Sequence, residues 1–416
     1  METGWKRNTA LFLSGQAFSL FGSALVQYAI LWHLILKTKS GSMMTLFALC
    51  GMLPAFFISP FGGVFADRFN RKYVINAADA AIALASLAAA LFFLTGFDSI
   101  GVLLVCAAVR AMGQGVQIPA VNALIPQIVP EKHLTRINGI NSSIQSGITL
   151  LSPIASGALL MLAPIAYIFF IDVVTAAIGI SIVFFMVKVP PVPKAEADSL
   201  GEASRDGIKQ SPLAKYFHEL KEGFGYVAKH GLILRLIVMY ALIFFAYSPL
   251  AYLTSLQVTR DFGADVWRLT AVEITFLVGM TAGGVLLSVW GGLKNRIRSI
   301  MLVTVMQGAG SIALGITGNF WVYAAIMAYL GLTTPFLTTP FMVLLQERAE
   351  PEYMGRVFGV FTMAATLMMP AGMLLFGPLG DIVPIDVILI CSGSALLLLA
   401  LPFAVSKILR EAGKTR

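Results

Sequence analysis

Long apolar stretches recur along the whole chain, and they limit what it can fold into. Each is long enough to cross the hydrocarbon core of a bilayer as one helix, which takes about 20 mostly apolar residues. Twelve such stretches can be counted. They cover residues 9–36, 43–66, 72–94, 100–128, 136–161, 165–187, 231–256, 268–291, 297–318, 320–346, 355–379 and 384–407.

The composition fits a chain embedded in lipid. Charged residues make up only 12% of the sequence, whereas a soluble domain contains about 25%. So few charges could not cover a globule with polar surface, but they suffice for a bundle whose outer solvent is lipid. Only helices or closed barrels satisfy the backbone in lipid, and long apolar runs favour helices over the short alternating strands of a barrel. We therefore predict an all-α membrane protein.

Two of the apolar stretches do not show by length alone how they divide into spans. The segment 299–346 contains no charge and is too long for one span, so we predict a turn at Gly318-Asn319. Near the N-terminus, Lys6 and Arg7 precede an apolar stretch that is too long for the core of a signal peptide. We interpret that stretch as the first span.

Residues 188–230 form the one long polar stretch between spans. It begins with Pro190, Pro191 and Pro193 and continues with mixed charges, which is typical of a linker. An amphipathic helix is expected near 212–228. We predict an N-terminal six-helix bundle at 1–187, a cytoplasmic linker at 188–230 and a C-terminal six-helix bundle at 231–416.

The distribution of Lys and Arg predicts the orientation in the membrane. With the N-terminus inside, the cytoplasmic segments contain 24 of these residues and the opposite side contains four. The remaining one, Arg110, lies within a span. This excess follows the positive-inside rule and predicts that both termini are cytoplasmic. It also explains the net charge of +8 without nucleic acid as a partner.

The two halves carry the same short patterns in the same order. The matches are Ser59-x-x-Gly62-Gly63 with Ser288-x-x-Gly291-Gly292, Pro119 eleven residues before Pro130-Glu131 with Pro340 eleven before Pro351-Glu352, and Ile171-Asp172-Val173 with Ile385-Asp386-Val387. Each match alone would be weak. Together they indicate duplication of a six-helix unit in parallel orientation, with a site between the two bundles.

The loop after the second span combines a glycine, an acid and three bases in a fixed order. Gly63 would let helices approach closely, and Asp67 can meet a basic side chain or the positive end of a neighbouring helix. Arg68, Arg71 and Lys72 can bind carbonyl groups, acids or lipid phosphates. The alternative is an ordinary positive-inside loop, but the ordered pattern favours a cytoplasmic gate.

Arg110 lies in the middle of the fourth span, where a charge costs at least about 2.5 kcal/mol and usually faces a cavity or a partner. Asp79, Asp172 and Glu273 are the candidate partners and proton carriers, because an apolar environment disfavours the charged form of a carboxyl group. A structural ion pair is the alternative for Arg110. Asp386 is more simply interpreted as an acid at a helix N-terminus.

Polar or adaptable side chains on other spans mark a candidate substrate cavity. They are Gln16, Ser19, Ser23 and Gln27 in the first span, Asn138, Asn141 and Gln145 in the fifth, Tyr240 and Tyr247 in the seventh, and Met363 in the eleventh. The polar ones recur at helical spacing and so share a helix face. Hydrogen bonding between helices, or simple packing, is the alternative.

The sequence offers little for other chemistry. The three cysteines fall in apolar runs, and the four histidines lack the spacing of a metal site. There is no phosphate-binding G-x-x-x-x-G-K-[ST] loop and no nucleophile-base arrangement. We therefore expect that the protein is not an enzyme and holds no metal or cofactor. We expect a proton gradient to supply its energy.

The ordered loop at 63–72 resembles the signature loop of the major facilitator superfamily. Phe65 stands where that family prefers Leu, and Asn70 stands where it prefers Gly. Asparagine tolerates left-handed backbone, so we expect the turn to be kept. Arg110-x-x-Gly113 resembles a fourth-span motif tied to proton coupling in exporters, and 147–157 resembles a degenerate form of their glycine-proline motif.

Over nearly its whole length the chain further resembles the bacterial macrolide-efflux branch of that family. The segments are Gly15-Gln16-Ala17-Phe18-Ser19, Asp67-Arg68 with Arg71-Lys72, Ala78-Asp79, Pro119-Ala120-Val121-Asn122-Ala123, Val129-Pro130-Glu131, Ile171-Asp172-Val173, Glu273-Ile274, and Gln346-Glu347 through Pro351 to Phe358. The resemblance implies proton-driven drug export, although related members export siderophores or move lysophospholipids.

We therefore predict a twelve-helix major facilitator fold in the cell membrane, working as a monomer by alternating access. Its expected partners are small amphipathic molecules such as macrolides, protons and the lipid bilayer. Pro335 and Pro340 should bend the tenth span, and Pro370 the eleventh. Two alternatives stay open: an exporter or importer of a physiological substrate (a siderophore, lysophospholipid or metabolite) on the same fold, and a non-transporting receptor or channel.

Overall fold

The computed structural model describes residues 4–189, 212–293, 295–350, 352–406 and 409. Every regular element within these ranges is helical. Twelve of the helical segments are long and apolar enough to cross a membrane. This confirms the predicted all-α membrane fold with twelve spans, while the side on which the termini lie stays a prediction.

Contacts between residues divide the chain into two compact units. The first comprises residues 1–33 and 47–215, and the second comprises 34–46 and 216–416. The short segment 34–46, which joins two helices of the N-terminal half, therefore groups with the second unit. The predicted linker boundaries stay a prediction, because residues 190–211 lie outside the described ranges.

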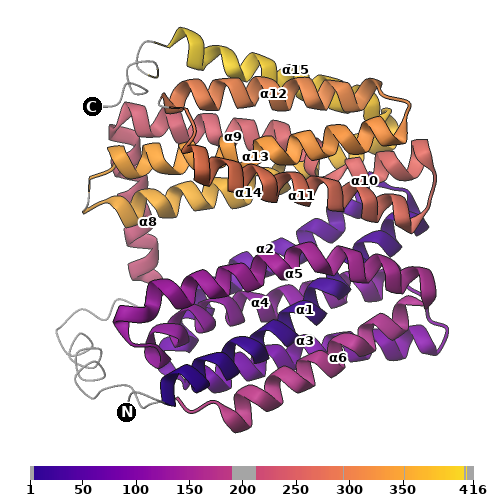
Figure 1. Ribbon diagram of the computed structural model, residues 1–416, viewed down its shortest axis with the longest axis vertical. Helices are drawn as coiled ribbons and strands as arrows, with labels where there is room; N and C mark the ends of the chain where they lie inside the picture. The colour runs from indigo at the N-terminus through magenta and orange to yellow at the C-terminus, as the bar shows by residue number, and fades with distance from the viewer. Residues whose placement is uncertain (1–3, 190–211, 294, 351, 407–408, 410–416) are drawn as a thin grey trace. The chain divides into compact units, whose positions relative to one another are not determined.

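The N-terminal half contains six spans (Figure 1). They are α1 (Gly4–Thr38), α2 (Gly41–Arg68), α3 (Arg71–Leu94), α4 (Ile100–Ile128), α5 (Leu134–Leu162) after the short η1 (Glu131–His133), and α6 (Ile165–Ser181) continued by the π-helical η2 (Ile182–Met186). Helix α3 packs against both α4 and α6. These three helices, together with α1, carry Asp79, Arg110, Asp172 and the side chains bonded to them.

The C-terminal half repeats this plan. Helix α8 (Pro212–Lys229) occupies the position where an amphipathic helix was predicted. The six spans are α9 (Gly231–Tyr252) continued by α10 (Thr254–Gln257) and η3 (Val258–Phe262), α11 (Val266–Trp290), α12 (Arg296–Ile316), α13 (Phe320–Arg348), α14 (Met354–Ile382) and α15 (Ile385–Val405). Helix α12 packs against α13 and α15, as α3 packs against α4 and α6.

Asparagines begin three of the spans. Asn319 accepts hydrogen bonds from the backbone of the first residues of α13, which confirms the predicted turn at Gly318-Asn319. Asn70 caps α3 and Asn295 caps α12, each through its side-chain oxygen. Asn70 does not use the left-handed conformation that asparagine tolerates, since its φ is −62°. Its side chain satisfies a free N–H at the helix start instead.

Glycines allow close helix contacts in each unit. A Cβ atom on Gly179 of α6 would lie 2.6 Å from the carbonyl oxygen of Gly15 in α1, and one on Gly393 of α15 would lie 2.6 Å from that of Gly308 in α12. Small residues let the two helix backbones approach closely, so the helices associate through van der Waals packing. Gly63 does not play the close-contact role predicted for it, because a Cβ there would meet nothing within 4 Å.

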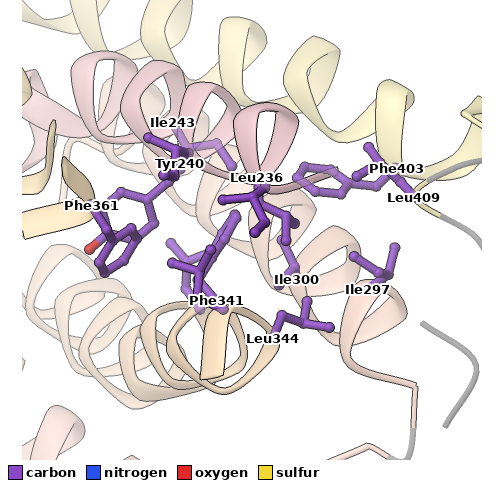
Figure 2. Packing of buried hydrophobic residues seen from close by; sticks show 14 of the residues in the cluster. Leu236, Tyr240, Ile243, Ile297, Ile300, Phe341, Leu344, Phe361, Phe403 and Leu409 are labelled. Atoms are coloured by element: carbon purple, nitrogen blue, oxygen red, sulfur yellow. The ribbon is translucent and has the colours of Figure 1, made fainter. Parts of the chain in front are cut away.

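The apolar core of the second unit lies among α9, α12, α13, α14 and α15 (Figure 2). Tyr240 of α9 belongs to this core, with its ring centroid 4.2 Å from that of Phe244 and 4.5 Å from that of Phe361. Phe341 meets the same ring edge-on at 5.1 Å. Pro335, Pro340 and Pro370 lie inside continuous helices of this unit.

Candidate functional site

Arg110 lies in the middle of α4 with only 1% of its surface exposed. Its guanidinium forms an ion pair with the carboxylate of Asp172 in α6. It also donates hydrogen bonds to the hydroxyl of Ser86 in α3, at 2.5 Å, and to the backbone oxygen of Ser23 in α1, at 2.8 Å. Four helices of the first unit therefore share this one cation.

The carboxylate of Asp172 is completely buried, at 0% exposure. Besides Arg110, it accepts a hydrogen bond of 2.6 Å from Ser86 and one of 3.4 Å from the hydroxyl of Ser23. A buried charge is tolerated only when it is paired and hydrogen-bonded. Asp172 meets both conditions, so this pair is electrically balanced within the unit.

Asp79 lies further along α3 and is also buried, at 1% exposure. One carboxylate oxygen accepts hydrogen bonds from Ser19 of α1, at 2.8 Å, and from the amide of Gln117 in α4, at 2.5 Å. The other oxygen has no hydrogen-bond partner among the described residues. Because its hydrogen-bond partners are neutral, these contacts leave a negative charge on Asp79 uncompensated.

The two carboxylates lie in two hydrogen-bonded clusters that share helices α1, α3 and α4, and we call these clusters together the polar network. Asp79 and Ser86 are seven residues apart on α3, as are Arg110 and Gln117 on α4. Seven residues are about two helical turns, or about 10 Å, so each helix presents both members on the same face. On α1, Ser19 and Ser23 reach the two carboxylates from one side, and Gln16 lies 3.4 Å from Gln117. The same helices thus carry a balanced ion pair and an acid with neutral partners.

The structure brings together three of the four predicted proton-coupling candidates. Arg110, Asp79 and Asp172 all lie in the network, whereas Glu273 is half-buried in α11 of the second unit. Ser86 and Gln117 were missed by the sequence analysis. Their position seven residues after Asp79 and Arg110 was the available signal.

The predicted cavity residues have different environments. Gln16, Ser19 and Ser23 are buried in the network, whereas Gln27 is half-buried. On α5, Asn138 and Gln145 are exposed and Asn141 is half-buried; in the second unit, Tyr240 and Tyr247 are buried and Met363 is half-buried. Their contact with substrate stays a prediction.

The basic residues of the predicted gate loop attach it to the first unit. Arg71 donates hydrogen bonds to the backbone oxygens of Ala66, at 3.2 Å, and Ala123, at 3.0 Å. Lys72 donates one of 2.8 Å to the backbone oxygen of Val187. Arg68 is exposed, and the side chain of Asp67 is not among those described. Arg71 thereby links the end of α2 to α4.

The second unit contains a related cluster that the sequence analysis did not identify. Asp386 of α15, the repeat partner of Asp172, accepts a hydrogen bond of 2.7 Å from the amide of Gln257. The hydroxyl of Tyr323 donates one of 2.9 Å to the same amide group. The partner of the repeated acid is thus a neutral amide here and a guanidinium in the first unit.

Twelve spans in two units of similar plan, with a buried ion pair inside one of them, define the chain as a multi-pass membrane protein. The sequence profile of the Major Facilitator Superfamily matches residues 9–373. The chain belongs to this family of transporters.

Relatives of known sequence are similar over nearly the full length. Macrolide efflux protein A of Streptococcus pyogenes is 30% identical over 402 residues, which cover 95% of each chain. Multidrug efflux pump Tap of Mycobacterium bovis is 24% identical over 384 residues, covering 89% of this chain and 86% of that protein.

Solved structures share the fold at low identity. A D-xylose-proton symporter aligns with a TM-score of 0.67 and 14% identity, covering 98% of this chain and 99% of its own. A POT family transporter in complex with 5-aminolevulinic acid aligns with a TM-score of 0.72 and 12% identity, covering 98% and 97%. These likenesses concern the fold alone.

Proposed function

We propose that this chain is a secondary active efflux transporter that exchanges protons for macrolide-like or other amphipathic drugs by alternating access. The observation that carries this proposal is the buried carboxylate of Asp79, which has neutral hydrogen-bond partners and shares helices α1, α3 and α4 with the contacts of the Arg110–Asp172 ion pair. The similarity to macrolide efflux protein A supports the substrate class.

Asp79 is the proton carrier in this proposal. Its second carboxylate oxygen has no hydrogen-bond partner among the described residues, so a proton can be placed there without displacing an existing bond. Protonation would remove a buried charge, and deprotonation would restore one. Coupling requires that protonation favours one conformation of the transporter over the other. A change of charge at Asp79 would do this if its surroundings differ between the two conformations.

Arg110 and Asp172 hold the network in position. Both are almost fully buried and bonded to three other helices. A change at Asp79 would reach them through α1, which carries Ser19 and Ser23, and through α4, which carries Gln117. Glu273, in the second unit, is a further candidate for proton or substrate contact. Substrate would contact the polar, aromatic and methionine candidates of α1, α5, α9 and α14.

The proposal also covers the orientation of the transporter, its gate and its energy source. The transporter would work as a monomer in the cell membrane with both termini in the cytoplasm, as the excess of basic residues in those segments predicts. The loop of Gly63, Asp67, Arg68, Arg71 and Lys72 would serve as the cytoplasmic gate. The proton gradient would supply the energy.

Transport of a labelled macrolide into inside-out proteoliposomes tests this proposal. An imposed pH gradient should drive accumulation by the wild-type protein. Asp79→Asn should abolish gradient-driven accumulation but keep exchange of labelled for unlabelled substrate, which needs no net proton movement. Glu131→Gln, which neutralises an exposed acid on η1, should behave as wild type.

Three results would count against parts of the proposal. Gradient-driven transport at wild-type rate by Asp79→Asn would remove Asp79 as the carrier, and the same result for Arg110→Ala would remove the role of the ion pair. Transport of a siderophore or lysophospholipid but not of drugs would reassign the substrate. Failure to accumulate any member of a broad panel would favour a receptor or channel.

A further inference from the structure

A pocket of about 640 Å³ lies within the first unit between the N-terminal parts of α1 and α5. Helix α1 contributes residues from Trp5 to Ala17, and the opposite wall runs from His133 to Ile144. The lining does not include the carboxylates or the guanidinium of the polar network. The pocket is therefore chemically distinct from the polar network.

Two basic side chains line the pocket. Lys6 and Arg136 line it from opposite walls, and none of its lining residues is acidic. Both cations are exposed, and neither has an ion pair or a side-chain hydrogen bond to another residue in the ranges that the structure describes. Trp5 stacks on His133 with ring centroids 4.8 Å apart, which closes one side. Two cations on one pocket, without such a partner in the part of the chain that is described, favour an anionic ligand group.

Apart from the basic residues and His133, the lining of the pocket is apolar except for two hydroxyls, and that of Ser14 already donates to the backbone oxygen of Leu11, at 3.0 Å. Leu13, Ile137, Ile140 and Ile144 supply hydrocarbon surface. Thr9 also lines the pocket; it is 1% exposed, and its hydroxyl oxygen has no hydrogen-bond partner among the described residues.

This missing bond at Thr9 is unusual within the same chain. A buried helical threonine normally donates to the carbonyl group four residues earlier. The buried Thr45 and Thr304 do so, at 2.9 and 2.7 Å. The hydroxyl of Thr9 does not, so it is available to a molecule inside the pocket.

We propose that this pocket binds a phosphate-bearing amphiphile, in the membrane an anionic phospholipid. The phosphate lies between Lys6 and Arg136, the hydroxyl of Thr9 donates to an oxygen of the headgroup, and an acyl chain follows Ile140 and Ile144. Basic pockets between membrane helices on the cytoplasmic side suit such headgroups. The inference does not depend on the direction of transport or on its coupling to protons.

Binding of lipid to the full-length protein tests the proposal directly. The protein is purified in detergent, stripped of lipid and titrated with phosphatidylglycerol or phosphatidylcholine, and bound lipid is counted by native mass spectrometry. Wild-type protein should bind phosphatidylglycerol more tightly. Lys6→Gln and Arg136→Gln should each weaken that binding about fivefold, as expected for one cation near a headgroup.

Matched variants separate the pocket from general charge effects. Lys229→Gln and Arg298→Gln remove exposed cations of the second unit and should leave phosphatidylglycerol binding unchanged. Thr9→Val keeps the shape of the side chain but removes its hydroxyl. It should weaken binding of both phosphatidylglycerol and phosphatidylcholine, because both carry the phosphate. Thermal unfolding of each variant shows whether it is folded.

Competition distinguishes the two sources of phosphate. If glycerol phosphate in solution displaces phosphatidylglycerol at equal concentration, the pocket recognises free phosphate esters; if it does not, the acyl chain is part of the ligand. Equal binding of both lipids by the wild-type protein together with no binding of glycerol phosphate would overturn the proposal. So would equal losses in the pocket variants and in the matched controls.

Discussion

The Ser86 hydroxyl donates a hydrogen bond of 2.6 Å to the Asp172 carboxylate, and both side chains are completely buried. The same hydroxyl accepts a hydrogen bond from Arg110. A neutral side chain of α3 therefore contacts both charges of the ion pair. Charged groups in a membrane need such contacts, because no bulk water is available to solvate them.

We expect Ser86→Ala to lower the free energy of unfolding by about 1–3 kcal/mol, because it leaves a charged acceptor and a charged donor each short of one buried partner. Ser143→Ala is the matched control, since the Ser143 hydroxyl is exposed and bonds only the backbone of its own helix. That change should stay within about 0.5 kcal/mol. Denaturant unfolding in micelles measures both, and equal losses would contradict the role given to Ser86.

The ion pair itself should show strong coupling between its two members. Arg110→Leu or Asp172→Leu alone leaves an uncompensated buried charge, which costs about 3–5 kcal/mol. The double variant removes both charges and should recover much of that loss. A double-mutant cycle on unfolding free energies gives the coupling energy. Simple additivity of the two single changes would show that the pair does not interact as described.

The sequence alone predicted the twelve spans and their repeat, and it identified Arg110 and its candidate partners. It could not select Asp172 over Asp79, because that choice depends on how α3, α4 and α6 are placed along one another. Asp172 is 62 residues from Arg110 in the chain. Helical periodicity gives the face of each helix but not its displacement against a neighbour.

The polar face of α1 shows a second limit of sequence reasoning. Gln16, Ser19 and Ser23 share one helix face and were predicted to mark a cavity. In the structure, Ser19 and Ser23 are hydrogen-bonded to buried carboxylates. A face that binds a neighbouring helix and a face that binds substrate have the same spacing, since both avoid lipid. Only the contacts of each side chain distinguish them.

Asp381 should stabilise the start of α2. Its carboxylate accepts hydrogen bonds from the backbone of Gly41, at 2.7 Å, and Ser42, at 2.9 Å, and from the hydroxyl of Ser40, at 2.9 Å. Asp381→Ala removes this cap, and loss of a cap costs about 0.5–2 kcal/mol. Hydrogen exchange at Gly41 and Ser42 should become faster to a corresponding degree.

Asp265 provides the control for that experiment. It stands at the N-terminal end of α11, but its side chain makes no capping hydrogen bond. Asp265→Ala should therefore leave exchange in the first turn of α11 nearly unchanged. Unchanged exchange at Gly41 and Ser42 in Asp381→Ala would mean that the carboxylate does not protect these amides.

The contact between α12 and α15 predicts opposite effects for two glycine substitutions. A Cβ on Gly393 would lie 2.6 Å from the backbone oxygen of Gly308 and 3.0 Å from the backbone nitrogen of Ile312, whereas one on Gly284 of α11 would meet nothing within 4 Å. Gly284→Ala should stabilise the protein by about 0.5–1 kcal/mol, because alanine loses less backbone entropy in a helix.

Gly393→Ala gains the same entropy but forces two backbones apart. Overpacking of this kind typically costs about 1–3 kcal/mol, which exceeds the entropic gain, so the net effect should be destabilising. Thermal unfolding of both variants under identical detergent conditions gives the sign of each change. If Gly393→Ala raised the unfolding temperature as Gly284→Ala is expected to, the two helices could not be packed through these glycines.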